Sequence, residues 1–372
     1  MKDKIIVNNN KRSQIPTILK GITPEQIKAI NMRQGKSFSY SMLDRQQPGN
    51  KMPKITRGKT PGVAPPPPPR PKAEFLTNIL DKVTKIDLPE LGAFNAGLVK
   101  FPHKEEYVMV YRPDEYAFVG CILDQNFKVK NKSYFRFSIS NCADPRIVWT
   151  PDGKLLMIYS STEEVGLRYE CIRGAIIMDL NVSEAFIDAK PFRVSPKELT
   201  DRQKNWTPFV HDGTIYLVAS ICPHIIYKLT LLDDNEIICE KVFETEWLNP
   251  WFYKDFLRGN TNPVLMDDGN YLGTFHTAVK LGPSMHYYDN GCYVFQGKPP
   301  FKVLKCSNQT YLPAEAAVEP HFRKGHLIMV DFPVGMVLNK DKLYISYGDN
   351  DSVVKIMETT VDTMLKLTVE VY

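Results

Sequence analysis

One short pattern recurs five times along residues 76–372 and constrains the fold more than any other feature of the chain. Each copy is a turn or polar residue followed by an apolar run that closes on an aromatic or small residue. Such a copy is typical of a hairpin turn that leads into a buried strand. The copies start about 50–70 residues apart and span Glu105–Arg112, Asp152–Tyr159, Asp212–Ser220, Asp268–Phe275 and Asp341–Tyr347.

This spacing leaves room for one four-stranded sheet per copy, and helical periodicity is almost absent from residues 76–372. Five such sheets arranged around an axis form a five-bladed β-propeller. A Greek-key sandwich is the main alternative, because short strands and turns alone do not exclude it. We prefer the propeller because the pattern repeats at blade length rather than at hairpin length. The predicted fold class is all-β, a five-bladed β-propeller preceded by a disordered, Pro-rich basic arm.

The distribution of charge predicts where that arm ends. The whole chain of 372 residues carries a net charge of +5, with 43% hydrophobic and 24% charged residues, which is an ordinary globular composition. Residues 1–75 hold 15 Lys and Arg, 4 Asp and Glu, and 11 of the 28 prolines, which leaves 32 basic and 38 acidic residues for the remainder. We therefore predict two parts, a basic arm at 1–75 and a mildly acidic propeller at 76–372.

The arm contains two local signals. Residues 24–34 could form a short helix with Thr23 as N-cap and Pro24 in the first turn. The run Pro65–Pro69 must be extended polyproline II, and it fits either a semi-rigid linker or a ligand for an SH3- or WW-type partner. Nucleic-acid binding is not favoured, because no aromatic residues interleave with the basic ones as a stacking platform.

The sequence favours an intracellular, cytoplasmic protein with no membrane partner. No apolar stretch reaches the length of about 18 residues that a membrane helix needs, and the N-terminus lacks the apolar region of a signal peptide. The seven cysteines are dispersed and form no C-x-x-C pair, which indicates neither a disulfide framework nor a zinc site. We predict no metal and no cofactor.

Polar residues flank the recurrent strands. Because the inner strands of a propeller converge on a central channel, such residues could share one pocket. One carboxylate near several cations and amides suits polar, anionic or hydroxyl-rich ligands. The flanking segments include Asn95-Ala-Gly97, Arg112, Asp144-Pro-Arg146, Arg173, Lys204-Asn-Trp-Thr-Pro-Phe209, Arg258-Gly-Asn-Thr-Asn-Pro263, His276, Asp331-Phe-Pro-Val-Gly335 and Tyr347-Gly-Asp-Asn-Asp351.

In this order the segments resemble the β-mannoside phosphorylases and β-1,2-mannosidases of glycoside hydrolase family 130 and the related protist β-1,2-mannosyltransferases. The likeness covers roughly residues 90–365, and its specificity comes from the ordered set rather than from any single motif. The matching segments are Asn95-Ala-Gly, Asp144-Pro-Arg, Lys204-Asn-Trp-Thr-Pro-Phe, Phe275-His276, Phe332-Pro-Val-Gly335 and Ser346-Tyr-Gly-Asp-Asn-Asp351.

The resemblance implies a role for each matching residue. Asp144 corresponds to the catalytic acid that protonates the departing glycosidic oxygen in an inverting reaction, where phosphate can itself be the nucleophile. The residues that correspond to phosphate-binding positions are Arg112, Arg173, Lys204 and His276. The residues expected to contact sugar are Asn95, Arg146, Asn205, Trp206, Tyr347 and Asp351, with the two aromatic rings suited to stacking on a sugar face.

The chain also departs from the family pattern. Ala143 stands where family members often carry Glu, Asn95 is followed by Ala instead of Pro, and the Lys-rich segment is altered. These changes leave the acid in place but leave the nucleophile open among phosphate, water and an acceptor hydroxyl. The sequence therefore predicts a glycoside phosphorylase or glycosyltransferase for β-mannosides or similar glycans, with oligosaccharide or sugar phosphate as partner. The alternatives are a hydrolase of the same fold and an inactive glycan-binding or scaffold propeller.

Each of these residues also has a purely structural interpretation. Asp144 could cap the turn before a strand and pair with Arg146, since Asp-Pro is a common turn opener. His276 taken alone would be a core histidine, and Lys204 taken alone would be a surface lysine. Only their ordered positions beside successive blades favour function.

Overall fold

A computed structural model describes residues 83–371 of the chain. Outside its description within this range lie residue 91 and the short stretches 114–116, 131–132, 162–170, 178–179, 181–185, 197, 200–202, 233–235, 250–256, 281–284, 313–320 and 324–325. The predicted arm at 1–75, its helix at 24–34 and the proline run Pro65–Pro69 all lie outside the described residues, as does the predicted boundary at residue 75.

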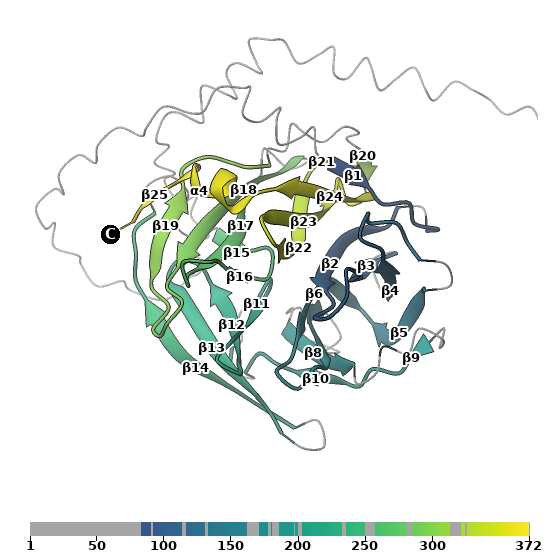
Figure 1. Cartoon of the computed structure of the whole chain (residues 1–372), viewed down its shortest axis with the longest axis horizontal. Helices are drawn as coiled ribbons and strands as arrows, with labels where there is room; N and C mark the ends of the chain where they lie inside the picture. The colour runs from purple at the N-terminus through teal and green to yellow at the C-terminus, as the bar shows by residue number, and fades with distance from the viewer. Residues whose placement is uncertain are drawn as a thin grey trace, which may run out of the picture. The chain divides into compact units, whose positions relative to one another are not determined.

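The described residues form five mainly antiparallel sheets arranged as the blades of a propeller (Figure 1). Blade 1 runs outward from the axis through β2 (Phe94–Lys100), β3 (Tyr107–Arg112), β4 (Ala117–Leu123) and β5 (Phe135–Ser140), with β9 (Phe186–Ile187) added in parallel. Blade 2 contains β6 (Cys142–Trp149), β7 (Leu155–Ser161), β8 (Cys171–Ile177) and β10 (Pro191–Arg193). Blade 3 contains β11 (Thr207–His211), β12 (Thr214–Ser220), β13 (His224–Leu231) and β14 (Ile237–Thr245).

Blade 4 is the largest of the five sheets. Its inner edge is split into β15 (Leu257–Gly259) and β16 (Val264–Leu265), which both pair with β17 (Tyr271–Lys280). The sheet continues through β18 (Met285–Phe295) and β19 (Val303–Ser307), while β21 (His326–Met329) pairs with β18 and with β20 (His321–Arg323). Blade 5 contains β22 (Asp331–Asn339), β23 (Lys342–Asp349) and β24 (Val353–Thr359).

Segments from both ends of the described range complete the last two blades. β1 (Val83–Lys85) pairs with β24 as the outer strand of blade 5, so residues before the first blade finish the final one. After β24 the short helix α4 (Val361–Leu365), capped by Thr360, leads to β25 (Thr368–Glu370), which pairs with β19 of blade 4. This exchange of strands joins the two ends of the ring.

The five recurrent segments of the sequence are the hairpins between the first and second strands of successive blades. Their apolar runs become β3, β7, β12, β17 and β23, which lie between the inner strand and the outer strands of each sheet. Second strands have sheet neighbours on both sides and packed faces, which is why they are the most uniformly apolar segments. The five-bladed propeller is confirmed, and the Greek-key sandwich is wrong because five separate sheets are present.

Glycine allows the inner strands to approach one another closely at the axis. A Cβ atom on Gly97 of β2 would lie 2.4 Å from the carbonyl oxygen of Pro145 on β6, and one on Gly335 of β22 would lie 2.3 Å from the backbone nitrogen of Leu98. Both distances are far below van der Waals contact, so only glycine fits at these two crossings. The apolar core fills the spaces between neighbouring blades instead of forming one central mass.

The seven cysteines are free, and all except Cys239 are buried. Burial in apolar surroundings makes a thiol unreactive. None of the helices in the described part of the chain is long and apolar enough to cross a membrane.

Candidate functional site

Polar residues take left-handed backbone conformations where the inner strands of three blades begin. Asn95 (φ 49°), Asp144 (φ 58°) and Asn205 (φ 62°) lie at or just before the starts of β2, β6 and β11. Asn and Asp tolerate this region better than other residues with a Cβ atom. In β2 and β6 the same positions coincide with a shift in strand register, a bulge that turns a side chain away from its regular direction.

The carboxylate of Asp144 is held by groups from blade 1. Asn95 Nδ2 donates a hydrogen bond of 2.9 Å to Asp144 Oδ1, and Arg112 Nη1 contacts the same oxygen at 3.2 Å. Asp144 itself is only 5% exposed. Both of these contacts go to Oδ1.

Nearby positive charges decide the protonation state of Asp144. Burial alone would raise the pKa of this carboxyl, but the charges of Arg112, Lys204 and Arg146, together with the hydrogen bond from Asn95, outweigh burial. The pKa of Asp144 is therefore held below its ordinary value of 3.8, and the group is ionised at neutral pH.

Arg146 joins three blades beneath this carboxylate. Its guanidinium donates to the backbone oxygens of Asn260, Asp144 and Gly259 at 2.6, 2.9 and 3.3 Å, and to Asn205 Oδ1 at 3.3 Å. The residue is 1% exposed, and burial lowers the pKa of Arg146 to about 10 although the charge of Asp144 opposes the shift. These four contacts let Arg146 position the strand starts, and its predicted role as a sugar contact stays a prediction.

His276 lies at the same polar centre, the group of residues around Asp144 and Arg146, but carries no charge. Burial, followed by the charges of Arg258 and Arg146, lowers the pKa of His276 well below its usual 6.5, although Asp144 acts in the opposite direction. Its Nδ1 lies 2.6 Å from Asn260 Oδ1, and its ring stacks on Tyr288. A cation at His276 would be buried among other cations in the free protein, and its predicted role in binding phosphate stays a prediction.

The other predicted site residues, Lys204, Arg173 and Asp351, lie in different parts of their blades. Lys204 directly precedes Asn205, and its charge acts on both Asp144 and His276, which places it at the same centre. Arg173 lies on β8, separated from the inner strand β6 by the intervening strand β7. Asp351 has φ 52° in the turn between β23 and β24.

The two aromatic residues predicted to stack on sugar are buried in the core. Trp206 is 1% exposed, its ring packs on Tyr227 at 4.7 Å between centroids, and its indole nitrogen donates to Gln203. Tyr347 is 3% exposed and packs in the cluster that joins blades 4 and 5. Neither ring presents a face to a ligand, and we leave both out of the proposed sugar site.

Two asparagines contribute to this centre that the sequence did not single out. Asn260 and Asn290 are both fully buried, and Asn260 Nδ2 donates to Asn290 Oδ1 at 3.0 Å. Asn260 belongs to the polar segment Arg258–Pro263 noted beside the fourth recurrent strand, so a signal existed. Nothing in that segment indicated which of its side chains would turn inward.

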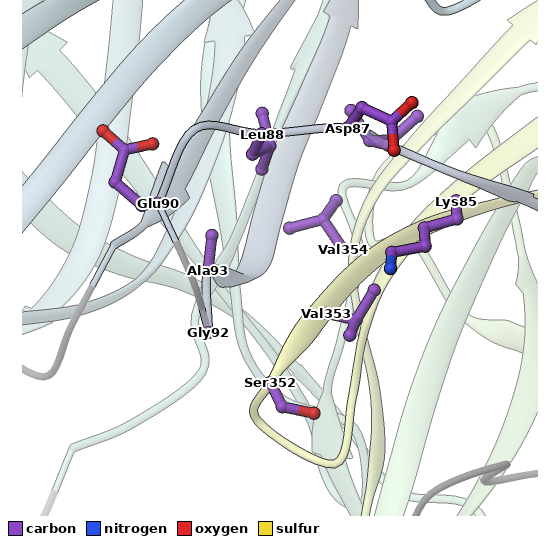
Figure 2. A pocket seen from close by; sticks show the side chains of 10 residues that line it. Lys85, Asp87, Leu88, Glu90, Gly92, Ala93, Ser352, Val353 and Val354 are labelled. Carbon is purple, nitrogen blue, oxygen red and sulfur yellow. The ribbon is translucent and has the colours of Figure 1, made fainter. Parts of the chain in front are cut away.

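A separate hollow lies between the segment that follows β1 and the turn that leads into β24 (Figure 2). It has a volume of about 180 Å³, and none of the predicted site residues lines it. Its lining mixes exposed charged residues with apolar ones and includes Lys85, Asp87, Leu88, Glu90, Ser352 and Val354. Within the described ranges no three His, Cys, Asp or Glu side chains come together as a metal site.

Comparison with known proteins identifies the family of the chain. The family model of glycoside hydrolase 130, described as β-1,4-mannooligosaccharide phosphorylase, matches residues 124–370, about two thirds of the chain. The chain belongs to the glycoside hydrolase 130 family. Its members are carbohydrate-active enzymes, and the matched residues include Asp144, Arg146, Lys204 and His276. A search of the curated proteins found no match.

Solved structures share the fold of this glycoside hydrolase 130 protein. A glycosyl hydrolase from Bacteroides ovatus is 14% identical, with a TM-score of 0.51 over 73% of this chain and 85% of that one. A β-1,2-mannobiose phosphorylase from Listeria innocua, solved with β-1,2-mannobiose, is also 14% identical, with a TM-score of 0.50 over 77% of this chain and 93% of that one. At these identities the likeness establishes the fold.

Proposed function

We propose that this protein is an inverting phosphorylase of β-mannosides, in which Asp144 is the general acid and Arg112 and Lys204 hold phosphate. The observation that carries the proposal is the cationic environment of Asp144. Its Oδ1 is held by Asn95 and Arg112, and the charges of Arg112 and Lys204 act on the carboxylate. The family match and the mannobiose phosphorylase from Listeria innocua support a mannoside as substrate.

The proposed reaction needs only one carboxyl group. Asp144 gives its proton to the glycosidic oxygen as the bond from that oxygen to the anomeric carbon breaks. A phosphate oxygen attacks the anomeric carbon from the opposite face, and the proton that phosphate loses restores Asp144. The products are mannose 1-phosphate and the shortened glycan. Asn205 and Asp351 stay proposed sugar contacts, while Asn95 acts through its hydrogen bond to Asp144.

Asp144 is ionised in the free protein, whereas the scheme needs it protonated. Phosphate binding can supply this change. The charges of Arg112 and Lys204 do most to lower the pKa of Asp144. An anion bound between them would neutralise part of their field, and the pKa of Asp144 would rise toward the range where it carries a proton. Binding of the phosphate nucleophile would thus favour the protonated form of Asp144 that the reaction needs.

Product analysis tests the proposal. The protein is incubated with β-1,2- or β-1,4-mannobiose with and without inorganic phosphate, and mannose 1-phosphate and mannose are quantified. Phosphorolysis predicts mannose 1-phosphate only when phosphate is present. Release of mannose regardless of phosphate would establish a hydrolase. Oligosaccharide formed from GDP-mannose, with release of GDP, would establish a glycosyltransferase.

The variant Asp144→Asn separates catalysis from binding. An enzyme loses turnover in this variant, whereas a glycan-binding propeller keeps its affinity for sugar and shows no turnover before or after the change. If no product formed from mannobiose, from mannose 1-phosphate with an acceptor, or from GDP-mannose, an enzymatic role at Asp144 would be refuted.

A further inference from the structure

We propose that Asn290 and Asn260 form a positioning relay that fixes the tautomer of His276, so that His276 Nε2 accepts a hydrogen bond from a hydroxyl group of the sugar substrate. The inference rests on the proposed function for its assumption that the ligand is a sugar. It assigns His276 a recognition role for a neutral group instead of a role in binding phosphate.

The relay begins at Asn290, whose amide orientation is fixed by backbone carbonyls. Asn290 Nδ2 lies 2.8 Å from the backbone oxygen of Asp331 and 3.1 Å from the backbone oxygen of Leu312. Carbonyl oxygens only accept hydrogen bonds, so the group that faces both of them must be the NH₂ of the amide. Asn290 Oδ1 therefore points the other way, as an acceptor.

The next member, Asn260, inherits its orientation from Asn290. The amide group of Asn260 that faces Asn290 Oδ1 at 3.0 Å must be the donating Nδ2. Its Oδ1 is consequently directed at His276 Nδ1, 2.6 Å away. Asn260 is fully buried, and its backbone oxygen accepts from Arg146, so the residue is also fixed at its backbone.

The last step sets the proton on His276. An amide oxygen has no hydrogen to give, so His276 Nδ1 must carry the hydrogen of that bond. The imidazole is neutral in these surroundings, and it holds one N–H only. His276 Nε2 is then a lone-pair acceptor.

Neighbouring groups hold the ring in place at the polar centre. His276 stacks on Tyr288 at 4.7 Å and 26°, and it meets Phe332 edge to face at 5.0 Å. The guanidinium of Arg146 lies 5.8 Å from the centre of the same Phe332 ring. Asp144 is close enough for its charge to raise the pKa of His276 against the larger effect of burial.

A fixed acceptor selects its ligand by chemistry. A sugar hydroxyl can donate to Nε2, whereas the unprotonated oxygens of phosphate would face a lone pair and be repelled. A site that must bind a sugar and an anion side by side can separate them in this way. Arg112 and Lys204 would take the anion, and His276 would take a hydroxyl.

The tautomer is measured directly by nitrogen NMR of the ¹⁵N-labelled full-length protein, with the His276 ring assigned by its loss in His276→Gln. We expect Nδ1 to have the protonated, pyrrole-type shift and Nε2 the unprotonated, pyridine-type shift at every pH between about 5.5 and 8.5. Addition of mannose should move the Nε2 resonance, and inorganic phosphate should not. A proton on Nε2, or titration of the ring in this range, would overturn the proposal even if the enzyme turns over mannosides normally.

The variants Asn260→Asp and Asn262→Asp test the relay itself. A carboxylate at 260 would stabilise imidazolium, so His276 should gain a proton on Nε2 and mannose affinity should fall about tenfold. Asn262 is a buried neighbour that donates to the backbone oxygen of Ile147, so its variant places an equal charge in the same loop away from His276. Equal losses of mannose affinity in the two variants, with an unchanged His276 spectrum, would refute the relay. Because the tautomer is read in the unaltered protein, a variant that fails to fold leaves the decisive measurement standing.

Discussion

Two buried carboxyl groups near the starts of inner strands have opposite protonation states. Asp144 on β6 of blade 2 is 5% exposed, and Asp331 on β22 of blade 5 is 1% exposed. The pKa of Asp144 is held below 3.8, whereas the pKa of Asp331 is raised to about 8. Burial acts in the same direction on both, so burial alone does not decide which carboxyl is an anion.

The neighbours of each carboxyl account for the difference. Asp144 has Arg112, Lys204 and Arg146 around it, and their charges exceed the cost of burial. Burial is the largest influence on Asp331. Its cross-strand partner Asp349 is a second negative charge, and the ammonium of Lys355 is bound to that partner. Both oxygens of Asp331 are without hydrogen-bond partners among the described residues. The same residue type thus becomes an anion at a cationic centre and a neutral acid beside another acid.

The largest expected effect separates the two groups by activity. Asp144→Asn should lower kcat for mannoside cleavage by about 10³-fold or more, because an amide cannot donate the proton that the leaving oxygen needs. Asp331→Asn is the matched change at an equally buried carboxyl and keeps the backbone oxygen that holds Asn290, so it should keep kcat within about threefold. The measurement is steady-state kinetics of both variants on the same substrate. Similar losses in the two would contradict the distinction between them.

Removing a neighbouring cation should raise the pKa of Asp144 toward that of Asp331. Arg112→Gln deletes the charge that does most to hold the pKa of Asp144 down, so the alkaline limb of the rate profile, where the acid loses its proton, should shift to higher pH. The loss of a charge-assisted contact should also weaken phosphate binding by about 30- to 100-fold, seen as a higher KM for phosphate. The control Arg136→Gln changes an exposed arginine that lies 3.8 Å from Glu90. Unchanged KM for phosphate in Arg112→Gln would show that the anion binds elsewhere.

Stability should depend on pH through Asp331. Its pKa is about 8 in the folded protein and near 3.8 when exposed, so folding takes up a proton between these values. The stability contributed by this group is therefore present below about pH 4 and is lost as pH rises toward 8. Between pH 4 and pH 8 the free energy of unfolding of Asp331→Asn should rise relative to that of the unaltered protein by about 5 kcal/mol. Urea unfolding of both proteins at pH 4 and pH 8 measures this free-energy difference. The same difference at both pH values would contradict the prediction.

The smallest effect is a proton taken up with an anion. Sulfate does not titrate near neutral pH, so it can occupy the cationic centre without changing its own charge. Binding near pH 5 should draw in a fraction of a proton as the pKa of Asp144 rises, and binding near pH 8 should draw in almost none. Calorimetry in two buffers of different ionisation enthalpy measures this uptake. Uptake that persists in Asp144→Asn would have to come from another group.

The fold was predictable because its main signal is local. Each recurrent hairpin carries its turn residue and its apolar run within about ten residues, so five copies could be recognised along the chain. The strands that complete the ring could not be found in this way. β1 and β25 are only three residues long, and their identity depends on partners, β24 and β19, that lie far away in sequence or in another blade.

The site was predictable as far as its backbone, but not its electrostatics. Asn95, Asp144 and Asn205 stand near strand starts, where the sequence follows the first with Ala96, the second with Pro145 and the third with Trp206. The charge of His276 depends on Arg258, Arg146 and burial, which come from two blades, and no local pattern encodes that sum. Trp206 was misjudged because an aromatic residue next to a polar segment fits a ligand platform and a space between blades equally well.

Infrared spectroscopy of the protonated-carboxyl C=O stretch tests the contrast between Asp144 and Asp331 most directly. At about pH 6 the anion-free protein should show a band that Asp331→Asn removes and Asp144→Asn leaves unchanged. Saturation with sulfate near pH 5 should add a second band, and this one should be absent from Asp144→Asn. If Asp144→Asn instead removed a band from the anion-free protein at pH 6, Asp144 would already be protonated, and the account of its cationic surroundings would be wrong.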